Sequence, residues 1–276
     1  MKADLHLHST ASDGKLSPEE LVQHAAEQGL TLMALTDHDS VEGVPAALAT
    51  AQKYPSLQVI PGVEIGTDVP HGEVHIVGYF VDYKSELLLS RLEKLRTGRL
   101  DRARRMIARL RDLGIHIEWA RVQELAGEGS VGRPHIAQAM QEKGYISSFK
   151  EAFEKYIGRN GPAYAEREKL TPVEAVEFIV TVGGLAVLAH PADIESKEKL
   201  LPELMKAGLV GMEVYYGNYS TEVMHTLLAL ARKHGLIPCG GSDYHGLDEL
   251  NETPVGFWDI PEESVKRLLA LAGKGQ

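Results

Sequence analysis

The sequence predicts an α/β fold in which seven short strands form a barrel or a distorted relative of one. Apolar, β-rich runs alternate with helix-like runs along most of the chain, as strands alternate with crossover helices. Each run is short and bounded by turn or helix signals, as buried parallel strands are. The predicted strands are Lys2–His6, Thr31–Thr36, Gln58–Val63, Val74–Phe80, Leu185–Ala189, Gly211–Val214 and Ile237–Gly240.

Segments between these strands carry helix signals. Ser17 precedes Pro18 and two acidic residues, and Thr171-Pro172-Val173-Glu174 repeats this order of cap, proline and acid. Further helices are predicted for Val44–Lys53, Glu195–Ala207 and Thr221–His234, the last one ended by Gly235.

The alternation of strands and helices is broken in two places. Only about ten residues separate the third strand from the fourth, too few for a crossover helix, so these strands are predicted to be antiparallel. Residues 97–167 hold helix-like segments and no convincing strand. We therefore expect a barrel formed by residues 1–96 and 168–276, with residues 97–167 as a small helical insertion that recognises the substrate.

Composition excludes several classes of protein. The formal net charge of −10 argues against a general coat for nucleic acid. No apolar run approaches the ~20 residues of a membrane helix, and no signal peptide is apparent. The single cysteine, Cys239, reads as a small core residue. We expect a cytoplasmic protein, because a reducing compartment fits this cysteine content.

Ligand-type side chains gather at the ends of the predicted strands. His6 and His8 lie two residues apart, so they point to one face of the first strand. Taken singly, each such residue also has an ordinary structural explanation, as a turn, cap, surface or core residue and not as a metal ligand. Together, six of the twelve histidines and three carboxylates fall at one edge, where α/β barrels build their sites. Nitrogen and carboxylate ligands together suit zinc, iron or manganese.

The residues in these positions form four ordered blocks. They are HLHS at 6–9, TDHD at 36–39, AHP at 189–191 and SDYH at 242–245. Through these four blocks and their order, the chain resembles the Polymerase and Histidinol Phosphatase (PHP) superfamily. The resemblance implies a distorted (β/α)7 barrel and two or three divalent metal ions. The ligands implied by the resemblance are His6, His8, Asp13, His38, Glu64, His75, His190, Asp243 and His245. Asp13 stands where some relatives carry histidine, which favours a harder ion such as manganese there.

Further segments narrow the resemblance to one group. PGVEI at 61–65, HIVGYF at 75–80, GRPHIA at 132–137 and GRNGPAY at 158–164 are similar to stand-alone members with a helical insert. That group includes nucleoside 3′,5′-bisphosphate phosphatases and short-RNA 5′ exonucleases. The resemblance implies a small phosphorylated substrate, a nucleotide or short RNA, with neither a membrane nor an obligate protein partner.

The insertion supplies candidate substrate-binding residues. Arg133 and His135 lie at a predicted helix start, where free backbone N–H groups bind anions. Arg159 lies in a Gly-rich loop, and arginine binds phosphate through two parallel hydrogen bonds. Residues 91–111 hold nine basic residues against two acids. That segment is either a solvated helix face or a groove for an RNA backbone.

The expected activity is hydrolysis of a phosphomonoester by a metal-activated hydroxide. His38, His190 and His245 are the candidate catalytic residues, although the sequence does not separate proton transfer from metal binding. Asp37 or Asp39 is expected to orient His38.

Three alternatives stay open for the function. The first is a histidinol phosphate phosphatase, and the second is an amidohydrolase, which also begins with H-x-H on a barrel strand. The third is a non-catalytic module associated with nucleic acid or a polymerase. Such modules lose ligands, whereas all nine positions here carry competent ones.

Overall fold

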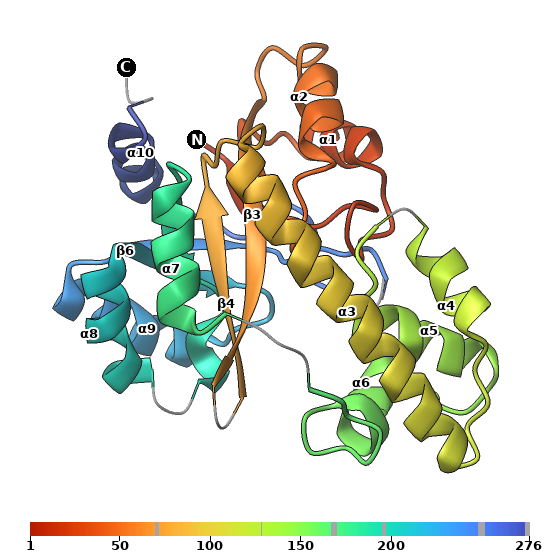
Figure 1. Cartoon of the computed structure of the whole chain (residues 1–276). Helices are drawn as coiled ribbons and strands as arrows, with labels where there is room; N and C mark the ends of the chain where they lie inside the picture. Colours follow the sequence, from red (N-terminus) through yellow and green to blue (C-terminus); the bar gives the residue numbers. More distant parts are fainter. Residues whose placement is uncertain (70–71, 128, 167–169, 195–196, 248–251, 274–276) are drawn as a thin grey trace.

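The computed structural model describes residues 1–69, 72–127, 129–166, 170–194, 197–247 and 252–273. Among these residues, no helix is long and apolar enough to cross a membrane. One seven-stranded sheet, ordered β1 to β7, forms the centre of the molecule (Figure 1). The strands are β1 Ala3–Leu7, β2 Leu32–Leu35, β3 Gln58–Val69, β4 Gly72–Tyr79, β5 Leu185–Leu188, β6 Leu209–Tyr216 and β7 Ile237–Gly241.

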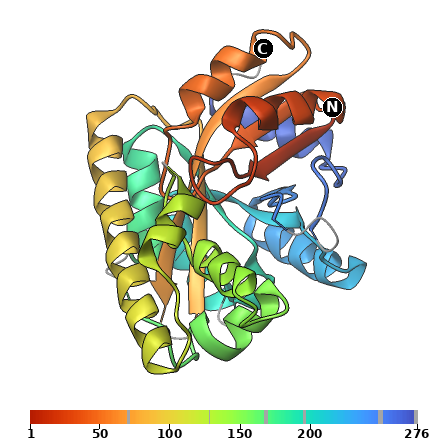
Figure 2. The ribbon, with the colours of Figure 1, turned by 90° about the vertical axis from the view of Figure 1, so that its right-hand side faces the viewer.

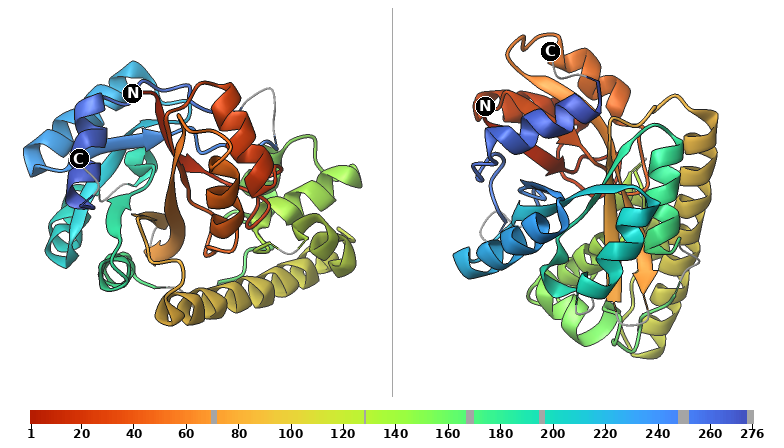
Figure 3. Two further views of the ribbon diagram at one scale, coloured as in Figure 1. Left: turned by 90° about the horizontal axis from the view of Figure 1, so that it is seen from above. Right: turned by 90° about the vertical axis from the view of Figure 1, so that its left-hand side faces the viewer.

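The sheet curves until its first and last strands meet. The N–H of His8 donates to the carbonyl of Tyr244 at 3.0 Å, and the N–H of Asp243 donates to the carbonyl of His6 at 3.0 Å. The left-hand view of Figure 3, seen from above, shows strands and helices arranged around this centre. The predicted α/β class and distorted barrel are therefore confirmed.

The third and fourth strands are antiparallel, as predicted, and β4 also runs antiparallel to β5. The other neighbouring pairs are parallel. The predicted end of the third strand at Val63 is wrong, because β3 continues to Val69 in register with β4. Pairing with the parallel strand β2 ends at Pro61, but β4 continues to pair with β3 from Gly62 to Val69. Glu64 therefore lies within a strand.

The barrel helices begin and end near the predicted residues. Ser17 and Thr171 each form a capping box with a glutamate three residues on, and Gly235 ends its helix with a φ of 68°. Glu195, at the predicted start of one helix, lies outside the described residues. The helices are α1 Pro18–Glu27, α2 Val44–Ala51, α7 Pro172–Thr181, α8 Lys197–Ala207, α9 Thr221–His234 and α10 Glu262–Leu271, with a short 3₁₀ helix, η2, at Pro191–Asp193.

Between β4 and α7, the described residues form helices and no strand. They are α3 Glu86–Asp112, α4 Trp119–Ala126, α5 Arg133–Glu142, α6 Phe149–Ala152 and a π-helical turn, η1, at Phe153–Ile157. Figure 2 shows α3 in yellow at the left edge, with the green helices of this segment below the red N-terminal part.

The long helix α3 belongs to two hydrophobic cores. Leu88, Leu92 and Leu95 pack in the barrel core. Ala103 and later residues pack in a separate core with α4, α5 and η1. The predicted boundary at residue 97 thus falls inside one continuous helix, and residues 167–169, at the other boundary, lie outside the described residues. The division into two domains stays a prediction.

The docking of α3 on the barrel can be tested through two leucines. Leu92 is fully buried, whereas Leu89 is 42% exposed on the same helix. We expect Leu92→Ala to lower the free energy of unfolding by about 2–4 kcal/mol, because it leaves a cavity. Leu89→Ala should change it by less than about 0.5 kcal/mol. Urea unfolding followed by circular dichroism measures both, and equal effects would contradict this packing.

Candidate metal centre

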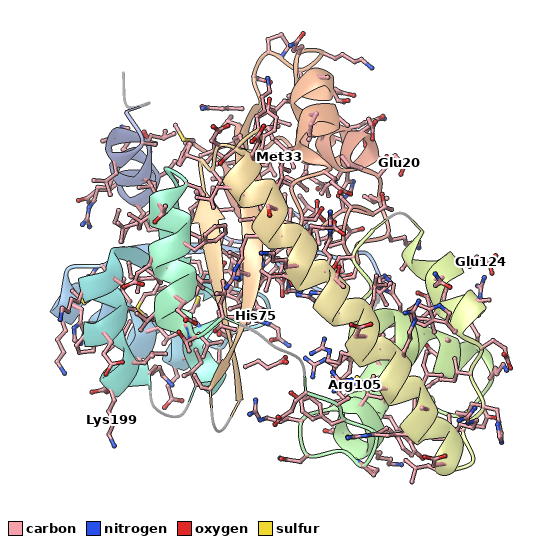
Figure 4. The ribbon with its side chains drawn as sticks, viewed as in Figure 1. Glu20, Met33, His75, Arg105, Glu124 and Lys199 are labelled. Atoms are coloured by element: carbon pink, nitrogen blue, oxygen red, sulfur yellow. The ribbon has the colours of Figure 1, made fainter. Side chains whose placement is uncertain are left out.

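The strand ends bring the predicted ligands into one cluster. His6 lies on β1 and His8 follows it, with both rings fully buried and their centroids 5.1 Å apart. His38 follows β2, His190 follows β5, and Asp243 and His245 follow β7. Figure 4 shows His75, on β4, near the centre of the molecule, while the labelled Glu20, Glu124 and Lys199 lie at its periphery. Glu64 lies within β3 and Asp13 lies in the loop after β1, and contacts between these side chains join all nine predicted ligands in one cluster.

A single buried carboxylate, that of Glu64, faces five of the histidines. Its Oε2 atom lies 3.2 Å from His6 Nε2, 3.3 Å from His8 Nε2 and 3.0 Å from His38 Nδ1. None of these three nitrogens has hydrogen-bond geometry to a partner. Three nitrogens converging on one oxygen is the arrangement expected around an ion that several ligands share.

The other oxygen of Glu64 faces two more rings. Its Oε1 atom lies 2.7 Å from His75 Nδ1 and 3.1 Å from His190 Nε2. The two ring nitrogens are themselves 3.1 Å apart. Neutral imidazole nitrogens at this separation need a proton or a cation between them, since two lone pairs repel.

Two aspartates complete the cluster. Asp243 Oδ1 lies 2.9 Å from His8 Nε2 and 3.2 Å from His6 Nε2. Asp13 lies 3.5 Å from His245 Nε2 and 4.0 Å from His38 Nε2. The predicted ligands thus share one continuous network.

The donor atoms fit divalent metal ions. Three groups of side chains place one nitrogen or oxygen each within 4.8 Å of the others. Their ligand atoms include buried ones without a hydrogen-bond partner, which would be costly in the absence of an ion. The groups are His8, Asp13, His38 and His245; His6, His8, Glu64 and Asp243; and His38, Glu64 and His75. The unpartnered atoms in these groups are His6 Nε2, His8 Nε2, Asp13 Oδ1, His38 Nδ1, Glu64 Oε2 and Asp243 Oδ1.

The electrostatics of the cluster place Glu64 and His38 in their metal-binding protonation states. Burial alone would raise the pKa of the Glu64 carboxyl, but His38, His6 and His75 hold that pKa well below its usual range. Burial lowers the pKa of His38 to about 3. At neutral pH, Glu64 is therefore ionised and His38 carries a free lone pair, which is the form that binds a metal.

The sequence analysis missed two supporting side chains on β6. Buried Glu213 accepts from His6 Nδ1 at 2.8 Å and from the backbone N–H of His190 at 2.7 Å. The Tyr216 hydroxyl donates to Asp243 Oδ2 at 2.6 Å. Such contacts fix the orientation of ligands. The available signal was Glu213 itself, a lone acid in an apolar strand.

The predicted role of Asp37 differs in the structure. Its carboxylate accepts three hydrogen bonds of 2.7 Å, from the N–H and hydroxyl of Ser9 and from the hydroxyl of Ser12. It therefore holds the loop that carries Asp13. Asp39 accepts from Arg99 Nε at 2.5 Å.

Three residues directly at the cluster adopt a left-handed backbone. The φ angles of Asp39, His190 and Asp243 are 50°, 26° and 56°. Non-glycine residues rarely adopt such angles, and strain of this kind gathers at functional sites.

A pocket opens from the cluster towards α3 and the insertion. Its metal-side wall holds Asp13, His38, His75 and His245. A second, basic wall carries three arginines beside Glu73, with an aromatic ring beneath one guanidinium. This wall includes Arg99, Arg102, Arg133 and Phe153, with the Arg133 guanidinium 5.2 Å from the Phe153 ring centroid. Arg99 and Arg102 come from the segment interpreted as a solvated face or an RNA groove, and both are buried.

The predicted substrate-binding residues occupy different places. Arg133 lines the pocket. His135 is buried at the start of α5, where its Nδ1 accepts from the N–H of Gly132 at 3.0 Å. Arg159 follows η1 and is not among the described residues lining the pocket. The roles of all three residues stay predictions.

Comparisons with known proteins agree along almost the whole chain. The PHP domain model matches residues 4–159. The chain is 35% identical over 268 residues to the 3′,5′-nucleoside bisphosphate phosphatase of Chromobacterium violaceum, covering 94% of this chain and 92% of that relative. It is 37% identical over 283 residues to the 5′-3′ exoribonuclease Rnm of Escherichia coli, covering 96% and 97%.

A solved structure extends the likeness to three dimensions. A protein of Bifidobacterium adolescentis, assigned as a metal-dependent phosphoesterase, superimposes with a TM-score of 0.88 at 28% identity, covering 98% of this chain and 96% of that one.

The shared carboxylate of Glu64 can be tested with an isosteric change. We expect Glu64→Gln to lose most of the divalent metal that the unmodified protein retains after reconstitution and desalting, because one amide oxygen replaces a charged bridge. Cys239→Ser is the buried control, since burial raises the pKa of that thiol and holds it neutral. Elemental analysis measures both variants. Full metal content in Glu64→Gln would show that Glu64 is not needed for binding.

Proposed function

The chain belongs to the PHP domain family and is a metal-dependent phosphoesterase, and on that premise we propose that it hydrolyses a phosphate ester of a nucleotide. The substrate is a nucleoside 3′,5′-bisphosphate or a short oligoribonucleotide. One observation carries this proposal: the ligand cluster and the arginines lie in the walls of one pocket. Such a pocket suits a small molecule with two phosphates, one at each wall.

We propose that the nine clustered side chains bind two or three divalent ions, of manganese, zinc or iron. When bound, such ions lower the pKa of a coordinated water and neutralise charge on a phosphoryl group. The mixed nitrogen and oxygen donors support these metals over magnesium or calcium.

The chain's own residues divide into an inner and an outer layer. His6, His8 and Glu64 have side chains no more than 1% exposed, so they serve binding alone. The candidate catalytic residues are in the outer layer, with side-chain exposures of 12% for His38, 25% for His190 and 19% for His245. Each outer ring can therefore reach a bound phosphate as well as the ligand cluster.

His245 has a defined orientation. Its Nδ1 lies 2.8 Å from the carbonyl of Asp243 and therefore donates the proton, because a carbonyl only accepts. Burial lowers the pKa of His245, but Asp13 and Asp243 raise it to about 10, so Nε2 is also protonated at neutral pH unless a bound cation displaces that proton. Without the proton, Nε2 would present a lone pair towards Asp13 and the pocket. We propose that this nitrogen binds metal or accepts a proton, and that His38 and His190 share these tasks.

The basic wall supports recognition of the second phosphate. Arg133 lies at the first turn of α5, next to the pocket, and is held flat by its contact with Phe153. We propose that Arg133 binds the phosphate distant from the metals. His135 acts by fixing the start of this helix, and we propose that the half-buried Arg159, which follows η1, contributes to binding the same phosphate.

Metal dependence predicts a stoichiometry. We expect reconstituted protein to contain at least two ions per chain, since the three overlapping donor groups together hold eight side chains, more than one ion binds. Chelation should abolish phosphatase activity, and manganese, zinc or iron should restore it. Elemental analysis and steady-state rates on the same samples measure this. A value below one ion per chain would contradict the proposal.

The second phosphate site predicts a substrate-dependent loss. We expect Arg133→Ala to lower kcat/KM on a nucleoside 3′,5′-bisphosphate by tenfold or more, about 1.4 kcal/mol of transition-state binding. The loss on p-nitrophenyl phosphate should be far smaller, because that substrate has no second phosphate. Arg159→Ala should behave in the same way. Arg104→Ala is the control, since that side chain is 59% exposed.

Two outcomes would overturn the assignment. Equal losses on both substrates would mean that Arg133 supports the fold or the metals. A preference of the unmodified protein for histidinol phosphate over the bisphosphate would favour that substrate instead.

A further inference from the structure

Glu73 lies in the basic pocket, where a second negative charge of the substrate would bind. It is on β4, two residues before His75, so the two side chains point to the same face of the strand. They lie about 7 Å apart along that strand. His75 reaches the ligand cluster and Glu73 reaches the arginines. The strand β4 therefore places the carboxylate of Glu73 beside the metal-binding cluster.

The carboxylate of Glu73 contacts two of the arginines. Its Oε2 pairs with Arg133 Nη2, and its Oε1 lies 3.5 Å from Arg102 Nη1. The Arg102 side chain is only 5% exposed, and those of Arg133 and Glu73 are each 16% exposed. Because buried arginines need a counter-charge, Glu73 supplies one in the absence of substrate.

Arg99, the third arginine of the pocket, has a different acid. Its Nε donates to Asp39 at 2.5 Å, and both side chains are buried. This pair joins α3 to the loop after β2. The pairs of Glu73 are closer to solvent, so they are the pairs that an incoming ligand can replace.

A substrate phosphate would compete well with the Glu73 carboxylate for Arg102 and Arg133. A carboxylate and a phosphate present oxygens to guanidinium groups in the same geometry. The carboxylate carries one negative charge, whereas a terminal phosphate carries about 1.5 to 2 at neutral pH. A terminal phosphate therefore attracts the two guanidinium groups more strongly than the single carboxylate does.

We propose that Glu73 is an exchangeable counter-ion that occupies the second-phosphate subsite between turnovers and is displaced by the substrate. This proposal rests on the proposed function. Glu73 pairs with Arg102 and Arg133 when the pocket holds no ligand. It also competes with a product that still carries the second phosphate, and so promotes its release.

The first experiment measures nucleotide affinity in metal-loaded protein. Glu73→Gln keeps the size of the side chain and removes its charge. We expect the KM for a nucleoside 3′,5′-bisphosphate and the inhibition constant of the nucleoside monophosphate product to fall about three- to tenfold, because one competing negative charge is removed. The KM for p-nitrophenyl phosphate, which has no second phosphate, should stay the same. Each of the two constants divided by that KM should therefore also fall.

Glu42→Gln is the matched control. Glu42 also pairs with an arginine of α3, Arg96, but it does not line this pocket among the described residues. We expect no change in the ratio. Glu73→Asp keeps the charge on a shorter side chain, so it should give an intermediate ratio and keeps the test valid if Glu73→Gln folds poorly.

The second experiment does not depend on the nucleotide assignment. Inorganic sulfate binding to metal-loaded protein is measured by calorimetry for the unmodified chain, Glu73→Gln, Arg133→Ala and the double variant. We expect Glu73→Gln to bind sulfate more tightly only when Arg133 is present, because the cycle isolates their coupling. This result would stand even if the protein showed no preference for bisphosphates.

Two outcomes would overturn the proposal. A higher KM for the bisphosphate in Glu73→Gln, matching the effect of Arg133→Ala, would mean that Glu73 holds the arginines in place for the substrate. An unchanged KM with unchanged sulfate affinity would mean that Glu73 is outside the subsite.

Discussion

The carboxylate of Glu64 is the interaction on which the rest of the site depends. It is fully buried and lies within 3.3 Å of five histidine nitrogens. These rings come from or follow β1, β2, β4 and β5, so one side chain connects most of the barrel. Burying one carboxylate among so many imidazoles is costly unless protons or metal ions share the space. The metal centre and the closure of the barrel at this edge therefore depend on each other.

The antiparallel position of β4 makes this arrangement possible. In a uniformly parallel barrel, neighbouring strands present only their carboxyl ends to the site. Here β3 and β4 form a hairpin, so Glu64 and His75 meet across it although neither residue lies at the carboxyl end of its strand. The same hairpin carries Glu73 into the basic pocket. The irregular strand thus joins the metal-binding wall to the arginines.

The helix α3 determines what the metal centre can act on. Its first turns pack in the barrel core and its last turns pack in the core of the insertion. Between them, arginines at a spacing of three residues meet acids from two barrel segments, the loop after β2 and the strand β4. These pairs are Arg96 with Glu42, Arg99 with Asp39, and Arg102 with Glu73. Because one rigid helix holds these contacts, the basic wall keeps a fixed position relative to the ligands.

The sequence by itself determined the elements and most of the ligand set, because both are written in local patterns. Alternating apolar runs predicted the strands, and the pair His6 and His8 showed its shared face through its spacing of two. Only the tertiary structure decided that Glu64 lies inside a longer strand, that Arg99 and Arg102 face inwards, and that Glu213 supports His6. Glu213 and His6 are 207 residues apart. A local pattern reports periodicity and burial, whereas such contacts arise only when strand register brings distant segments together.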